Sequence, residues 1–156
     1  MVSVLILDGF SDAKHASGAY IPFFEGLLRF SGVKCRTVTP DGFERIYSVF
    51  GKTADNIIYV PRLSEIGKQG LSFIYADSTS GSSASFRIAS ALRERRSENG
   101  VVFVNPLCEG DPLASYSPVI VDDICVDKTD AAGLYSLALD AACSICSYYG
   151  IPVKEA

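Results

Sequence analysis

The chain has 156 residues, of which 48% are hydrophobic and 21% are charged, and its formal net charge is −4. This composition excludes a disordered chain, and the acidic balance argues against nucleic-acid binding, which ordinarily uses a basic face. The length predicts a single domain over residues 1–156, and no apolar run approaches the ~20 residues of a membrane span, so no membrane association is expected.

Short apolar strands alternate with helices along the chain. The strands are expected at residues 2–7, 33–39, 56–60, 71–76, 101–104 and 118–121, and the helices at 19–30, 43–50, 85–98 and 130–149. The first strand has no basic flank and no cleavage site, which argues against a signal peptide. Because strands that are apolar throughout are buried on both faces, we predict a three-layer α/β sandwich with a mostly parallel sheet and helices on both faces.

The helix expected at residues 85–98 has recognisable signals at both ends. A loop rich in serine and glycine precedes it, and Ser82 or Ser83 is expected to accept a hydrogen bond from a free amide of its first turn. Its last residues include Arg93, Arg95 and Arg96, interrupted by glutamates. Such a run is typical of a solvated helix end.

The five cysteines are odd in number and lie in mostly apolar contexts. Without a secretion signal, this usage predicts reduced, buried thiols in a cytoplasmic protein. Cys143 and Cys146 have the CxxC spacing of redox and metal sites, but they lie in an apolar helical run with no second pair. We therefore expect them to pack in the core.

Acidic residues follow two of the predicted strands. Asp8 ends the first strand, and Asp122 and Asp123 end a late one. Ligands of α/β sheets bind at the carboxyl ends of strands, so these carboxylates could share one crevice with Asp12 and with His15, the single histidine, which is expected in a polar loop. Paired acids there could bind a cation or act as acid and base. The alternative is helix capping and turn formation.

Several segments follow one another in an order that points to a family. They are Asp8-Gly9-Phe10 after the first strand, the passage 31–39, Arg45, the segments 54–58 and 85–96, the strand 117–122 and the turn 127–130. In this order they resemble the zinc-dependent N-acetylmuramoyl-L-alanine amidases of the amidase-3 type, over most of the chain. The resemblance implies an amidase-like α/β fold.

In that family two histidines and a glutamate hold zinc, and a further glutamate activates the attacking water. Here the histidine positions read Phe10 and either Pro61 or Arg62, and residues 12–20 contain no glutamate. A single histidine cannot supply two imidazoles, so we expect neither a metal site nor a zinc cofactor. Asp122 stands at the position of the catalytic glutamate. The ligand-binding cleft that the resemblance implies would be lined by Asp8, Phe10, Asp12, His15, Pro61 and Arg62.

Two functional hypotheses remain open, and with them whether the chain is an enzyme. In the first, it is a non-catalytic, amidase-like domain that binds a peptidoglycan fragment or has a structural or regulatory role with a protein partner. In the second, it is an amidase-like, cell-wall hydrolase with an acidic site of Asp8, Asp12, His15 and Asp122. The hydrophobic content also suggests that a protein partner or another copy of the chain covers apolar surface, and in the second case the protein would be a homo-oligomer.

Overall fold

The computed structural model describes residues 2–10, 14–50, 56–63, 71–116, 118–124 and 131–155. Within this part of the chain, six strands form one sheet in the order β2-β1-β3-β6-β4-β5. Their bounds are β1 Ser3–Leu7, β2 Lys34–Val38, β3 Asn56–Leu63, β4 Leu71–Ala76, β5 Val101–Pro106 and β6 Val119–Ile124.

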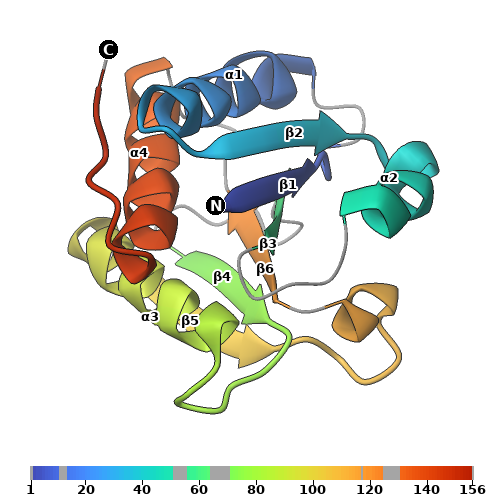
Figure 1. Cartoon of the computed structure of the whole chain (residues 1–156). Helices are drawn as coiled ribbons and strands as arrows, with labels where there is room; N and C mark the ends of the chain where they lie inside the picture. Colours follow the sequence, from blue (N-terminus) through green and yellow to red (C-terminus); the bar gives the residue numbers. More distant parts are fainter. Residues whose placement is uncertain are drawn as a thin grey trace.

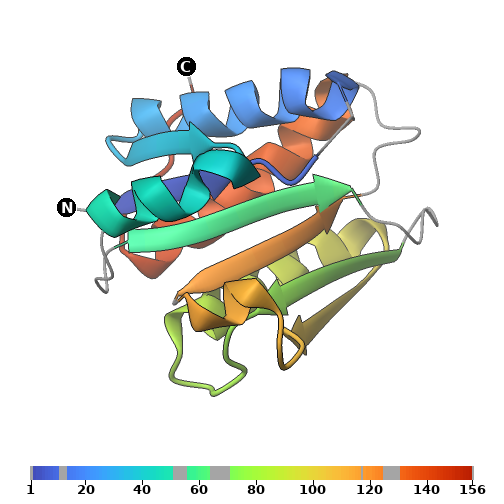
Figure 2. The same ribbon diagram turned by 90° about the vertical axis from the view of Figure 1, so that its right-hand side faces the viewer.

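The sheet is mixed, with a change of direction next to β6. The strands β2, β1, β3 and β6 run parallel to one another. β4 pairs with β6 in the antiparallel sense, and β5 is parallel to β4. Figure 2 shows β6 between β3 and β4, which point in opposite directions. The carboxyl ends of β1, β3 and β6 therefore lie at the same edge of the sheet.

The helices are divided unequally between the two faces of the sheet (Figure 1). α1 (Lys14–Phe30), α3 (Ala84–Arg96) and α4 (Ala131–Tyr148) pack on one face, called here the helical face. α2 (Phe43–Phe50) and the short turn η3 (Pro112–Ser115) pack on the other, called here the open face. The predicted three-layer α/β architecture is thus confirmed.

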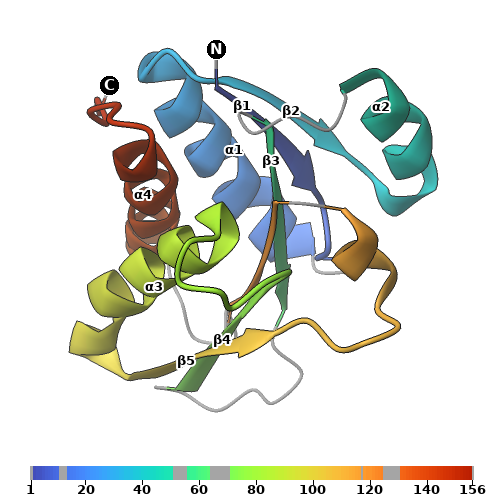
Figure 3. The ribbon, with the colours of Figure 1, turned by 60° about the horizontal axis from the view of Figure 1, so that its bottom comes forward.

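Alternation along each strand produces two separate cores. In β1, Val4 and Ile6 join the core under the helical face, whereas Leu5 and Leu7 join the smaller core of the open face. Successive strand residues point to opposite faces, so a strand that is apolar throughout needs cover on both. On the open face that cover comes from α2 and from η3 with the residue that follows it, which lie on the same side of the sheet in Figure 3. The rings of Phe43 and Tyr116 meet there, with their centres 5.0 Å apart.

Two element boundaries differ from the sequence prediction. α1 begins at Lys14, five residues before the expected start at residue 19, so His15 lies in its first turn and not in a loop. The strand expected to end before Pro61 continues as β3 through Leu63, because Pro61, Arg62 and Leu63 each pair with a residue of β6. Non-local pairing has outweighed the signal of proline as a strand terminator.

The cap expected before the third long helix is confirmed. Ser83 has extended backbone geometry, and its side-chain oxygen accepts a hydrogen bond from the amide of Phe86 at 3.2 Å. Ser82 is exposed and does not form this contact. α3 therefore starts where the serine-rich loop ends.

Candidate functional site

The two aspartates at the end of β6 point to opposite faces of the sheet. Asp122 lies under the helical face, where Arg96 and Tyr59 contact it. Asp123 lies on the open face, where it forms an ion pair with Arg62. Neighbouring residues of a strand always separate in this way. The structure therefore does not bring Asp122 and Asp123 into one crevice.

Asp122 is the centre of a buried polar network. It has no exposed surface, and Arg96 is only 5% exposed. Arg96 Nη1 donates to Asp122 Oδ1, and the Tyr59 hydroxyl donates to Asp122 Oδ2. The Tyr59 oxygen lies 2.5 Å from the Tyr20 hydroxyl, which is therefore the donor in that pair. Arg96 Nη2 also donates to the carbonyl of Leu137 at 3.0 Å.

Electrostatics fix the charge states within this network. Burial, reinforced by the charge of Asp122, raises the pKa of Tyr20 and that of Tyr59, so both hydroxyls stay protonated. Burial alone would lower the pKa of Arg96, but the charge and hydrogen bond of Asp122, together with the two nearby tyrosines, outweigh burial and the pKa is raised. One cation and one carboxylate are thus buried together, with two neutral phenols as further donors.

The network joins most of the elements of the helical face. Tyr20 comes from α1, Arg96 from α3, and the Leu137 carbonyl from α4, while Tyr59 and Asp122 come from β3 and β6. Both oxygens of Asp122 are engaged and neither is accessible to solvent. A general base needs contact with the proton that it removes, and this arrangement gives the buried Asp122 oxygens no contact with solvent.

On the open face, the pair of Arg62 and Asp123 borders a group of aromatic rings. The Arg62 guanidinium lies 5.4 Å from the ring centre of Tyr75. The ring of Phe73 stacks on that of Phe103 at 5.5 Å and lies 6.5 Å from that of Tyr75. We call these three rings the aromatic patch. Burial alone would lower the pKa of Arg62, but its hydrogen bond to Asp123 and the negative charge of that residue together outweigh burial and raise the pKa.

The remaining predicted site residues have structural surroundings. Asp8 Oδ1 accepts a hydrogen bond from the Phe10 amide at 3.0 Å, which is the turn-forming alternative. Phe10 is 1% exposed, and its ring meets that of Tyr20 edge-on at 5.8 Å. Pro61 is buried in β3 opposite Asp122. Asp12 and the side chain of His15 lie outside the described residues.

Gly9 permits the close approach of the end of β1 to β3. Its amide donates to the Pro61 carbonyl at 3.0 Å, and a Cβ added at Gly9 would lie 2.8 Å from that oxygen and 2.9 Å from Arg62 Cβ. Both obstacles are held by the sheet, so relief requires the strands to separate. We expect Gly9→Ala to lower the free energy of unfolding by about 1–3 kcal/mol, as overpacking does. Urea denaturation measures this, with Gly26→Ala as the control, since nothing lies within 4 Å of a Cβ there. Because Gly26 is inside α1, the control is expected to raise the free energy of unfolding by about 1 kcal/mol.

Sequence reasoning missed Arg96, Tyr20, Tyr59 and Tyr75. Arg96 was expected to be solvated together with Arg93 and Arg95, which are indeed exposed. A signal for its burial was present, because Arg96 follows the buried positions 85, 88, 89 and 92 of α3 at helical spacing. The tyrosines have no comparable signal, since their positions in apolar segments are also those of ordinary core residues.

The residues present do not fit the zinc site of the amidase family. The side chains of Phe10 and Pro61 have no atom that could coordinate zinc, and both oxygens of Asp122 already accept hydrogen bonds within the protein. Among the described residues, no group of three or more His, Cys, Asp or Glu side chains could hold a metal ion.

Cys143 and Cys146 lie in α4 as free thiols, but only Cys146 packs in the core, where burial raises its pKa to about 11. Cys143 is half-buried and Cys108 is exposed, so the prediction of buried thiols is wrong for these two residues.

Comparison with known proteins found no match to a protein-family model, a curated protein or a solved structure. In the described part of the chain, no helix is both long and apolar enough to cross a bilayer.

Proposed function

We propose that this chain is a non-catalytic, amidase-like domain that acts by binding through the open face of its sheet. The observation that carries the proposal is the state of Asp122. The position that the resemblance assigns to the catalytic glutamate holds a carboxylate that is fully buried and bonded to Arg96 and Tyr59. Activity would require this carboxylate to leave its counter-ion, which costs about 3–5 kcal/mol when a buried pair is broken.

The open face is the better candidate for binding because it combines exposed apolar rings with charge. Phe103 is 46% exposed, and the Arg62 side chain is 36% exposed beside Tyr75. Aromatic rings and arginine together are typical of surfaces that contact partners. A peptidoglycan fragment is the ligand that the amidase resemblance suggests, and a protein partner is the alternative. A cytoplasmic location belongs to the same proposal, since the described cysteines are free.

The hydrolase hypothesis has less support. It requires Asp8 and Asp122 to act in one site, whereas Asp8 forms a turn and Asp122 lies in the buried network. A shared cation or a shared proton would need their oxygens close together on a solvent-accessible surface.

The proposed function is tested by two measurements on the purified chain. Metal content and amide hydrolysis of peptidoglycan are expected to show neither stoichiometric zinc nor turnover. Binding of soluble peptidoglycan fragments is expected to weaken in Tyr75→Ala and to persist in Tyr148→Ala, which removes an exposed tyrosine from α4 on the helical side. Zinc at one equivalent together with turnover would overturn the proposal, and so would equal binding by both variants when thermal melts show both folded.

A further inference from the structure

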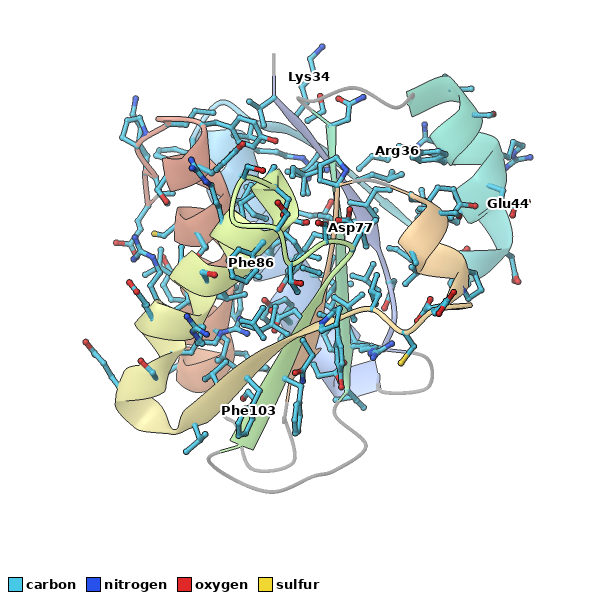
Figure 4. All side chains as sticks on the ribbon, turned by 90° about the horizontal axis from the view of Figure 1, so that it is seen from below. Lys34, Arg36, Glu44, Asp77, Phe86 and Phe103 are labelled. Carbon is cyan, nitrogen blue, oxygen red and sulfur yellow. The ribbon has the colours of Figure 1, made fainter. Side chains whose placement is uncertain are left out.

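The two edge strands of the sheet differ in how they are protected. β2, at one edge, carries Lys34 and Arg36 with exposed side chains. Charged side chains on an edge strand are a common protection against pairing with another sheet. β5, at the other edge, has the sequence Val-Val-Phe-Val-Asn-Pro and carries no charge. Figure 4 shows Lys34 and Phe103 at the two opposite edges of the sheet.

β5 also exposes apolar side chains on one face. Val101 is 56% exposed and Phe103 is 46% exposed, and both point to the open face, while Val102 and Val104 pack under α3. The ring of Phe103 continues the aromatic patch to the edge of the sheet. In the described sheet, β4 is the only strand paired with β5, so the outer backbone groups of β5 have no strand partner.

We propose that β5 pairs in the antiparallel sense with β5 of a second copy of this chain, so that the two sheets become one. Two identical edges related by a two-fold axis pair antiparallel, and this arrangement closes as a dimer. Val101 and Phe103 of one copy then lie across from the same apolar strand of the other, on the same face. β5 itself ends at Pro106, which has no amide hydrogen, so the proposed pairing is confined to Val101–Pro106.

Charge favours the pairing of two β5 edges over the other edge pairings that two copies of this chain could form. Two β2 edges would bring Lys34 and Arg36 of each copy together, and like charges directly opposite are unfavourable. A β2 edge against a β5 edge would leave a free edge of each kind and form an open filament. β5 contains no charged residue, so the pairing of two β5 strands brings no like charges together within the strands.

The test is sedimentation equilibrium of the whole chain between about 1 and 100 μM, with one variant at the interface and one matched control. Phe103→Lys places like charges across the two-fold axis, and Val49→Lys makes a comparable change at an exposed residue of α2, 85% exposed. We expect the wild type and Val49→Lys to reach twice the chain mass of 16.7 kDa, and Phe103→Lys to stay at 16.7 kDa.

Amide hydrogen exchange identifies the surface independently. The outer amides of β5 are expected to be protected at high protein concentration and to lose that protection on dilution, in the wild type and in Val49→Lys. A wild type that is monomeric at 100 μM overturns the proposal. A dimer that persists in Phe103→Lys with unprotected β5 amides also overturns it, because the interface then lies elsewhere. If Phe103→Lys does not fold, the dilution experiment on the wild type still decides whether β5 forms the interface.

Discussion

Asp122→Asn is expected to lower the free energy of unfolding at pH 7 by about 3–5 kcal/mol. The substitution keeps the size of the side chain but removes the charge that balances Arg96, which is buried and has Asp122 as its anionic partner. The guanidinium then remains in an environment of low polarity, with its Nε already lacking a hydrogen-bond partner in the described part of the chain. Urea denaturation followed by circular dichroism measures the loss.

Glu94→Gln is the matched control for this substitution. It makes the same chemical change on α3, two residues before Arg96, at a side chain that is exposed. Surface substitutions of this kind change stability by about 0.5 kcal/mol or less. A stability of Asp122→Asn equal to that of Glu94→Gln would contradict the role assigned to the buried pair.

Alkaline pH is expected to unfold the protein through Tyr20 and Tyr59. Burial raises the pKa of both hydroxyls above the value of about 10 that tyrosine has in an unfolded chain. Their contribution to stability is therefore fully present below pH 10 and is lost as the pH rises above it, because the unfolded chain releases protons that the folded chain retains. Each tyrosine contributes a slope of about 1.4 kcal/mol per pH unit, so the pair contributes about 2.8 kcal/mol per pH unit.

Tyr20→Phe isolates this effect. The variant should lose about 1 kcal/mol at neutral pH with the hydrogen bond to Tyr59, and its stability should then fall less steeply above pH 10, by about 1.4 kcal/mol per pH unit. As the control, the stabilities of the wild type and Tyr20→Phe are compared between pH 7 and 8.5. The difference between them should stay constant there, since tyrosines are neutral in both the folded and the unfolded chain. Parallel stability curves above pH 10 would contradict the burial of a protonated Tyr20.

The fold could be predicted largely from local patterns. Continuous apolar runs correspond to strands covered on both faces, and Ser83 caps α3 as the loop chemistry indicated. The sheet order could not be predicted in the same way. β6 lies between β3 and β4, and this placement depends on pairing between segments about sixty residues apart along the chain, which no local pattern records.

The site was less predictable than the fold, for two different reasons. The period of two along a strand already separates Asp122 from Asp123, so the shared crevice could have been rejected from the sequence alone. The partner of Asp122 could not have been identified with equal certainty. Helical spacing places Arg96 on the buried face of α3, but its pairing with Asp122 depends on how α3 sits over β6.

The most direct test of the buried ion pair is a double-mutant cycle between Arg96 and Asp122. Asp122 is the buried counter-ion of Arg96, and the proposed non-catalytic function depends on this pairing. Unfolding free energies of the wild type, Arg96→Met, Asp122→Asn and the double variant give the coupling. We expect the loss of unfolding free energy in the double variant to be smaller than the sum of the two single losses by about 1–3 kcal/mol. Losses that add within about 0.5 kcal/mol would show that the two side chains are not paired in solution and would contradict the claim.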